Sequence, residues 1–110
     1  MRLAAVAVAL ALPTAALALS TAERMAIRSG QVLGAALGCG IDRARFLAVS
    51  RTTIGLIEEA SLDRRDAERA RRAFERTVAT VSRNMARYQD QCATARGDFE
   101  RAEAAQPPVD

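Results

Sequence analysis

Apolar residues in the second half of the chain recur with the period of an amphipathic helix. Between residues 67 and 102 they follow one another in steps of three and four, which places them on one helix face. We call this set the apolar seam; its members are Ala67, Ala70, Phe74, Val78, Val81, Met85, Tyr88, Cys92, Ala95, Phe99 and Ala102. The seam predicts one long helix over about 64–96, and its heptad-like spacing is typical of a coiled coil.

The end of this long helix is predicted from local composition. Gly97-Asp98 can stop one helix and cap another, so the pattern leaves two alternatives, a helix that continues through Gly97 or a break there followed by a short last helix over 98–105. Two prolines follow, and residues 106–110 are therefore predicted to form a disordered tail.

Two shorter helices are predicted before the seam. Ser20 and Glu23 have the spacing of a capping box, and the helix that they open is predicted over about 21–38. Asp42 is a favourable N-cap for a second helix, which is predicted over about 43–60.

The first of these helices carries a ridge of small side chains. Ala26, Gly30, Gly34 and Gly38 recur every four residues, so they line up on one face. In a membrane such a ridge would be a helix-dimerisation face, but the charged residues of this segment argue against insertion. We therefore expect the ridge to pack closely against another helix of the same domain.

The first 22 residues have the pattern of a secretory signal peptide. A positively charged start precedes an unbroken apolar run over residues 3–12, which is too short to span a membrane. Small residues fit cleavage after Ala18 or after Ala22. The pattern predicts export to the periplasm or out of the cell, with a helical domain over 23–105.

The chain has two cysteines, and in an exported protein they are expected to pair. A Cys39–Cys92 bridge closes a loop of about 54 residues, which stabilises the fold by about 4 kcal/mol in the chain-entropy model. If the second helix folds back tightly on a continuous third helix, Cys92 lies roughly 13 Å beyond the level of Asp42. The first helix is then expected to cross the third near Cys92 or to continue outward along its far half. These patterns predict an all-α fold, a three-helix or helical-hairpin-like domain with a long C-terminal helix, stapled by one disulfide.

The amino-acid composition limits which kinds of partner and site the protein can have. Cleavage after Ala22 removes Arg2 and lowers the net charge from +3 to +2, which is too small to indicate a nucleic-acid partner; all 16 basic residues of the chain are arginine. The chain has no histidine, so it lacks the commonest general base and neutral metal ligand. No catalytic, cofactor-binding or metal-binding residues are predicted. Glu58, Glu59 and Asp63 form an acidic cluster that we interpret as a solvated turn, because a hard cation needs more converging oxygens.

Arginines follow the predicted third helix at helical spacing. This arginine stripe comprises Arg65, Arg69, Arg72, Arg76, Arg83 and Arg87. It could face an acidic partner or, as a less favoured hypothesis, anionic lipid head groups. The plainer interpretation is a solvated face with ion pairs such as Glu68–Arg72 and Arg87–Asp90.

Several short motifs follow one another along the mature chain. They are Val32-Leu33-Gly34, Cys39-Gly40, an arginine-bearing second helix ending near Glu58-Glu59, Arg71-Arg72-Ala73-Phe74, Tyr88 and Cys92. In this order and spacing, the chain from about Arg24 to Ala102 resembles an uncharacterised family of small exported two-cysteine helical proteins from alphaproteobacteria. The resemblance implies export, the bridge and the helices, and it implies no activity.

The sequence therefore favours a non-enzymatic interaction or structural protein of the periplasm. Such a protein would hold a protein partner, or another copy of itself, through the arginine stripe or the apolar seam. A periplasmic stress chaperone and an accessory subunit of an envelope complex are the alternatives. No cofactor is expected.

Overall fold

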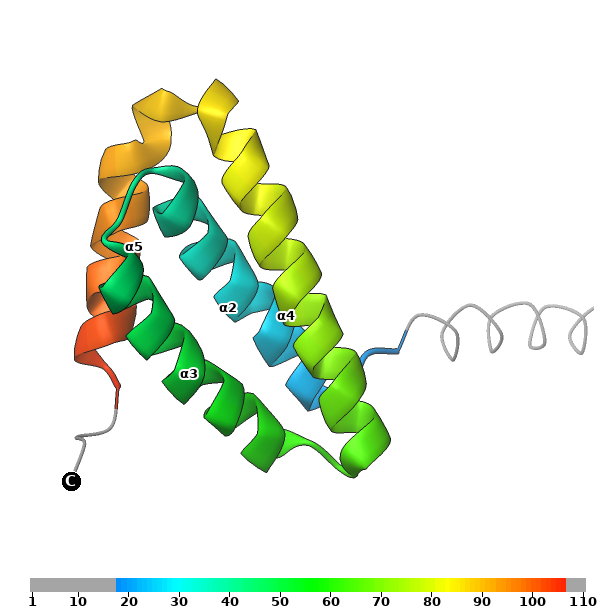
Figure 1. Ribbon diagram of the computed structural model, residues 1–110. Coiled ribbons are helices and arrows are strands. Elements are labelled where there is room, and N and C mark those ends of the chain that lie inside the picture. The colour runs from blue at the N-terminus through cyan, green and yellow to red at the C-terminus, as the bar shows by residue number, and fades with distance from the viewer. Residues whose placement is uncertain (1–17, 107–110) are drawn as a thin grey trace, which may run out of the picture.

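The computed structural model describes residues 18–106, and this part of the chain forms four α-helices. They are α2 (Thr21–Gly38), α3 (Arg43–Ala60), α4 (Arg64–Asn84) and α5 (Cys92–Ala104), with two 3-10 turns, Met85–Arg87 and Gln89–Gln91, between α4 and α5. Successive helices run in alternate directions, so α2 is parallel to α4, and α3 and α5 run the other way (Figure 1). The described residues contain no strand, and the predicted all-α fold is confirmed.

The helices predicted over 21–38 and 43–60 have the bounds of α2 and α3. Most of the predicted signal peptide and the last four residues of the predicted tail lie outside the described part of the chain.

The central helix is α2. It packs most extensively against α4, and it also contacts α3 and α5. The small-residue ridge lies against α4: a Cβ built on Gly34 would lie 2.9 Å from the carbonyl oxygen of Val78, and one on Gly38 would lie 2.5 Å from that of Ser82. No side chain fits at such distances, so glycine here lets the two helix backbones approach closely.

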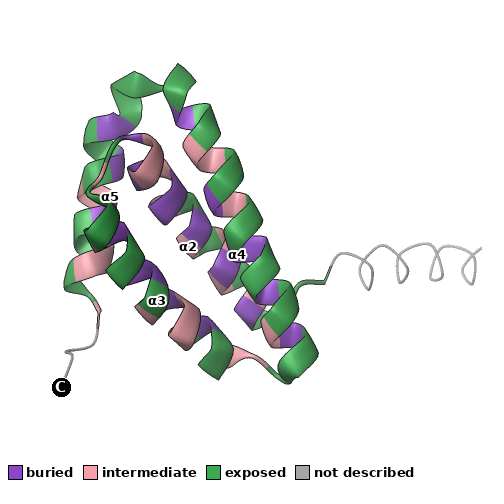
Figure 2. Ribbon diagram, viewed as in Figure 1, coloured by how far each residue is buried: buried purple, intermediate pink, exposed green. Residues whose placement is uncertain are grey.

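Buried residues lie mainly on the inward faces of the helices (Figure 2). The largest members of the main core are Leu33, Phe46, Ile57, Phe74 and Phe99. A second, smaller cluster surrounds the disulfide and consists of Cys39, Met85, Cys92 and Ala95.

Gly40 ends α2 and turns the chain toward α3. Its φ of +84° lies in the left-handed region, which glycine enters without a steric penalty. The N–H of Gly40 donates to the carbonyl of Leu37 at 3.1 Å, and the N–H of Ile41 donates to that of Ala36 at 3.0 Å. These two bonds are the pattern of a Schellman motif, which satisfies carbonyls that the helix leaves free.

The prediction of one continuous helix over 64–96 is wrong. α4 ends at Asn84, and α5 begins only at Cys92, after the two 3-10 turns. Gly97 lies inside α5, so the predicted break at Gly97-Asp98 and the separate last helix over 98–105 are wrong as well.

The break after α4 has a local cause and a long-range one. Tyr88 leaves the helical region, with φ −129° and ψ 46°, and the side-chain amide of Gln89 donates to the carbonyl of Met85 at 3.1 Å. In a continuous helix, that carbonyl would accept the backbone N–H of residue 89. The bridge also brings the Cα atoms of Cys39 and Cys92 to 5.5 Å, whereas a straight helix would carry Cys92 about 10 Å beyond Met85.

The apolar seam keeps its phase across this break. Phe74 and Val78 on α4 are buried, and so are Ala95 and Phe99 on α5. Periodicity thus identified most of the buried positions, but it did not show that two helices share them, and Tyr88, at the break, is 49% exposed. Apart from Tyr88 the seam is covered within the chain, with α2 packed against both of its halves, and it does not present the open face of a coiled coil.

The expected course of the first helix is also wrong. α2 neither crosses the third helix near Cys92 nor continues outward, because it runs alongside α4 and also packs against α5. The expectation assumed that α3 folds tightly onto α4. Instead, α3 and α4 diverge from their connecting turn, and α2 packs against both.

Candidate functional site: the arginine stripe of α4

Half of the arginines of the chain lie on α4 and the 3-10 turn after it. Residues 64–87, which form α4 and the 3-10 turn after it, hold eight arginines and three carboxylates, a net charge of +5. The whole chain carries +3, so the remainder is slightly acidic. All members of the arginine stripe are exposed: Arg65, Arg69, Arg72, Arg76, Arg83 and Arg87.

Helical geometry aligns the stripe. Its five members on α4 follow at spacings of four, three, four and seven residues, and a helix of 3.6 residues per turn returns such positions to nearly the same direction. Arg87 follows in the 3-10 turn. The core-facing side chains Phe74 and Val78 leave α4 on a different side, so the stripe is free to meet a partner.

Two arginines of the stripe have carboxylate partners on the same helix. Arg69 lies 3.7 Å from Asp66, and Arg72 lies 4.0 Å from Glu68, the second of these pairs being predicted from the sequence. The other members make no ion pair with any described residue: Arg65, Arg76, Arg83 and Arg87.

The predicted Arg87–Asp90 pair is wrong. The prediction placed both residues on one continuous helix, three positions apart. They lie instead in two separate 3-10 turns with Tyr88 between them, so the helical spacing no longer brings their side chains together.

Arg76 also borders a shallow groove between α2 and α4. The groove has a volume of about 310 Å³, and its walls include Gln31, Thr77 and Thr80. The amide and hydroxyl groups at these positions are hydrogen-bond donors, and they share the walls with the apolar side chains of Ile27 and Val81. The stripe is thus continuous with a hollow that can receive part of a partner.

Charges between α3 and α5 are, by contrast, neutralised locally. Arg45 donates two hydrogen bonds to the carboxylate of Glu103, at 3.1 and 2.6 Å, and its guanidinium lies 5.4 Å from the ring centroid of Phe99. The hydrogen bond from Arg45 lowers the pKa of Glu103. On α5 itself, Arg101 pairs with Asp98.

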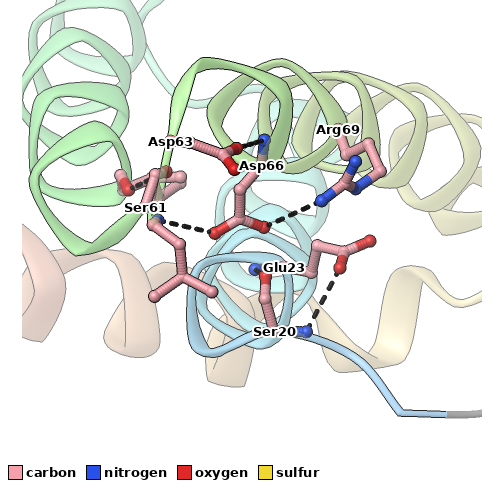
Figure 3. A network of polar contacts seen from close by, with 8 residues as sticks. Ser20, Glu23, Ser61, Asp63, Asp66 and Arg69 are labelled. Carbon is pink, nitrogen blue, oxygen red and sulfur yellow. Dashed lines mark hydrogen bonds and ion pairs between the residues drawn. The ribbon is translucent and has the colours of Figure 1, made fainter. Parts of the chain in front are cut away.

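A buried carboxylate holds the N-terminal end of α4. Asp66 is 1% exposed, and one of its oxygens accepts the backbone N–H of Leu62 at 2.9 Å. Ser20, at the start of α2, and Arg69 lie close to this carboxylate (Figure 3). The pKa of Asp66 is lowered, chiefly by the nearby Ser20 hydroxyl; the Leu62 N–H adds to this effect, and burial opposes it. The carboxylate therefore ties the start of α2 to the start of α4.

Sequence reasoning missed the role of Asp66. The one available signal is its place three residues after Asp63, which caps α4 by accepting the Asp66 N–H at 2.8 Å. Acidic residues are common in the first turn of any helix, so this signal could not reveal a contact with Ser20, 46 positions earlier in the chain.

The disulfide joins Cys39, just after α2, to Cys92, the first residue of α5. The predicted pairing is confirmed, and both cysteines are buried. One turn further along α5, Arg96 donates a hydrogen bond of 2.9 Å to the carbonyl of Cys39. Because both sulfurs are in the bridge, neither is a thiolate nucleophile in this state.

Residues 18–106 show no sign of two other kinds of site. In that range no group of three or more acidic, histidine or cysteine side chains is placed to hold a metal ion. Nor does any helix there combine the length and the apolar character needed to cross a membrane. Comparisons of the chain with family models, with curated proteins and with solved structures found no match. The resemblance to an alphaproteobacterial family accordingly stays a prediction.

Proposed function

We propose that this protein is a non-enzymatic contact protein of the periplasm, and that its arginine stripe binds an acidic surface of a protein partner. The observation that supports this most is the net charge of +5 on α4 and its following turn, where four exposed arginines have no carboxylate partner among the described residues. A concentrated charge of this kind speeds the encounter with an oppositely charged surface and sets its orientation.

The stripe has a rigid support. Asp63 caps α4, and Asp66 anchors the first turn of this helix. The small-residue ridge of α2 packs along α4. Arginines on a fixed helix lose less conformational freedom on binding than arginines on a loop. The planar guanidinium also matches the geometry of a carboxylate, which favours an acidic protein surface as the ligand.

The proposed location rests on the N-terminal signal pattern and on the bridge. Disulfides persist in oxidising compartments such as the periplasm, and they are rare in the cytosol. The Cys39–Cys92 pair therefore supports export.

Binding of a second copy through the apolar seam has less support. Phe74 and Phe99 are at most 3% exposed, and Val78 is 9% exposed. These side chains already belong to the core of one chain, so exposing them to another copy would require partial unfolding.

Site-specific photo-crosslinking in the periplasm tests the proposal. A photoreactive residue replaces Thr80, which borders the groove, and in a second strain it replaces the exposed Leu47 on α3. We expect a crosslinked partner from position 80 and not from position 47. With the partner identified, binding is then measured at increasing salt, which should weaken it because salt screens exposed charges.

Matched charge reversals make the test specific. Arg76→Glu/Arg83→Glu/Arg87→Glu alters the stripe, and Arg28→Glu/Arg43→Glu/Arg51→Glu makes the same change of net charge elsewhere on exposed positions. We expect the first variant to lose at least tenfold in affinity, about 1.4 kcal/mol, and the second to lose far less. Equal losses would show that only net charge matters. Flotation with anionic vesicles, in the absence of any protein crosslink, would assign the stripe to lipid instead.

A further inference from the structure

The N-terminal pattern offers two cleavage positions, after Ala18 and after Ala22, and the structure distinguishes them. We propose that a signal peptidase hydrolyses the Ala18–Leu19 bond, so that the mature protein begins at Leu19. Water supplies the hydroxyl to the carbonyl carbon of Ala18 and a hydrogen to the nitrogen of Leu19 as the peptide bond breaks. This processing site presupposes the export proposed above.

Ser20 belongs to the folded domain. Its hydroxyl oxygen accepts the backbone N–H of Glu23 at 3.0 Å, and its own backbone N–H donates to the Glu23 carboxylate at 3.1 Å. This reciprocal pair is a complete capping box, and it satisfies N–H groups that the first turn of α2 leaves free. Cleavage after Ala22 would remove the cap and leave that turn without it.

Ser20 is also a partner of the buried Asp66. Its hydroxyl is the main group that favours the ionised carboxylate there. Leu62 and Arg69 remain the other neighbours of the carboxylate, the first by a hydrogen bond and the second at 3.7 Å. A mature chain that began at Glu23 would therefore keep a 1% exposed carboxylate while losing the hydroxyl group that lies beside it (Figure 3).

Ala22 is part of the core. It is 0% exposed and belongs to the main cluster together with Ala26, one turn further along α2. Its removal would open a gap at the end of the core, and it would place the new positively charged amino group at Glu23, in the first turn of a helix. A positive charge at that end opposes the helix dipole.

The two bonds also differ in accessibility. Ala18 and Leu19 are exposed and precede the helix, whereas the bond after Ala22 lies within the first turn of α2. Proteolytic cleavage is favoured in exposed, non-helical segments. The Ala18–Leu19 bond is thus open to a peptidase before and after α2 forms, and the Ala22–Glu23 bond only before.

Intact-mass spectrometry of the exported protein decides between the positions. The full-length chain is expressed in a bacterium with its own export machinery, and the product is purified from the periplasm without reduction. We expect the mass of residues 19–110 less two hydrogens for the bridge. A product that begins at Glu23 would overturn this processing site and leave the proposed export intact. An uncleaved chain retained in the cytoplasm would overturn both.

A pair of substitutions outside the helix adds a control. Ala18→Leu places a large side chain at the residue whose peptide bond is cut, and Leu17→Ile alters its neighbour, where size is tolerated. We expect the precursor to accumulate at least tenfold in the first variant and to be processed normally in the second. Normal processing of Ala18→Leu to the wild-type product would contradict the inference.

Discussion

The guanidinium of Arg96 donates a hydrogen bond of 2.9 Å to the carbonyl oxygen of Cys39, the residue that follows α2. The C-terminal end of a helix carries a partial negative charge, and α2 has no basic residue in its own last turn. A side chain from α5 therefore supplies the positive charge that α2 lacks, 57 positions away in the sequence.

Replacing Arg96 tests this contact. We expect Arg96→Ala to lower the free energy of unfolding by about 1 kcal/mol, because a hydrogen bond and a favourable dipole interaction are lost together. Urea denaturation followed by circular dichroism measures the change. Arg101→Ala is the control, since Arg101 pairs only with Asp98 on the surface of the same helix. It should cost less than about 0.5 kcal/mol. Equal effects of the two substitutions would rule out a special role for Arg96.

Replacing glycine by alanine should have opposite effects in the small-residue ridge of α2 and on α3. A Cβ on Gly34 would lie 2.9 Å from the carbonyl oxygen of Val78, whereas a Cβ on Gly55 would meet nothing within 4 Å. We expect Gly34→Ala to destabilise the protein by about 2 kcal/mol through overpacking. Gly55→Ala should stabilise it by about 0.5–1 kcal/mol, because alanine is the better helix former. Thermal unfolding of the two variants would show shifts of opposite sign, and a shift of the same sign would contradict the close α2–α4 contact.

Removal of the bridge should cost more than any single surface change. The cysteines are 53 positions apart, and closing a loop of that size stabilises the folded state by about 4 kcal/mol in the chain-entropy model. We expect Cys39→Ala/Cys92→Ala to lose a comparable amount in guanidinium denaturation. Wild-type protein measured in excess dithiothreitol provides the comparison and should be destabilised to a similar extent. A variant as stable as the oxidised protein would show that the loop is already ordered without the bridge.

The contact between Ser20 and Asp66 predicts in which direction the stability of the protein changes with pH. The pKa of Asp66 is lowered in the folded protein, so its contribution to stability is present above the ordinary aspartate pKa of about 3.9. That contribution is lost as the pH falls through the lowered value. Ser20→Ala removes the main cause of the lowered pKa together with the cap, so the midpoint of acid unfolding should move to higher pH.

At neutral pH, the lost cap alone should lower the stability of Ser20→Ala by about 1 kcal/mol. Acid titration followed by circular dichroism measures the midpoint, and urea denaturation at pH 7 measures the stability. Thr21→Ala is the matched control, because Thr21 is exposed and does not cap the helix. An unchanged midpoint of acid unfolding in Ser20→Ala would show that Ser20 does not influence the titration of Asp66.

Local signals were sufficient for the first two helices and insufficient for the rest. Ser20 and Asp42 are caps whose partners lie three residues away, so the sequence around them specifies where α2 and α3 begin. The end of α4 coincides with the turn at Tyr88 and with the position that Cys92 takes to reach Cys39, and the spacing of apolar residues contains neither. The heptad spacing is uninterrupted at the break because Cys92, on the next helix, continues the apolar seam. The spacing of apolar residues alone does not show that the chain changes direction.

The candidate site, like the fold, could be predicted only in part from the sequence. The arginine stripe is visible in the sequence because four- and three-residue spacings define a helix face. Which arginines lack a partner could not be predicted, because that depends on where α4 stops and on the carboxylates that the neighbouring helices use. Asp90, for example, was assigned to Arg87 by helical spacing, and the turn at Tyr88 separates them.

The bridge also has a consequence for what happens when the backbone is cut. Residues 39–92 form a covalent ring that contains the whole of α3 and α4. The turn between these two helices is an exposed tip, where Leu62 is 85% exposed, and such tips are preferred points of proteolytic nicking. One cut there opens the ring without releasing a fragment, so α4 and its arginines stay joined to α2 through Cys92 and Cys39. Only a cut combined with reduction, or a second cut, would separate them.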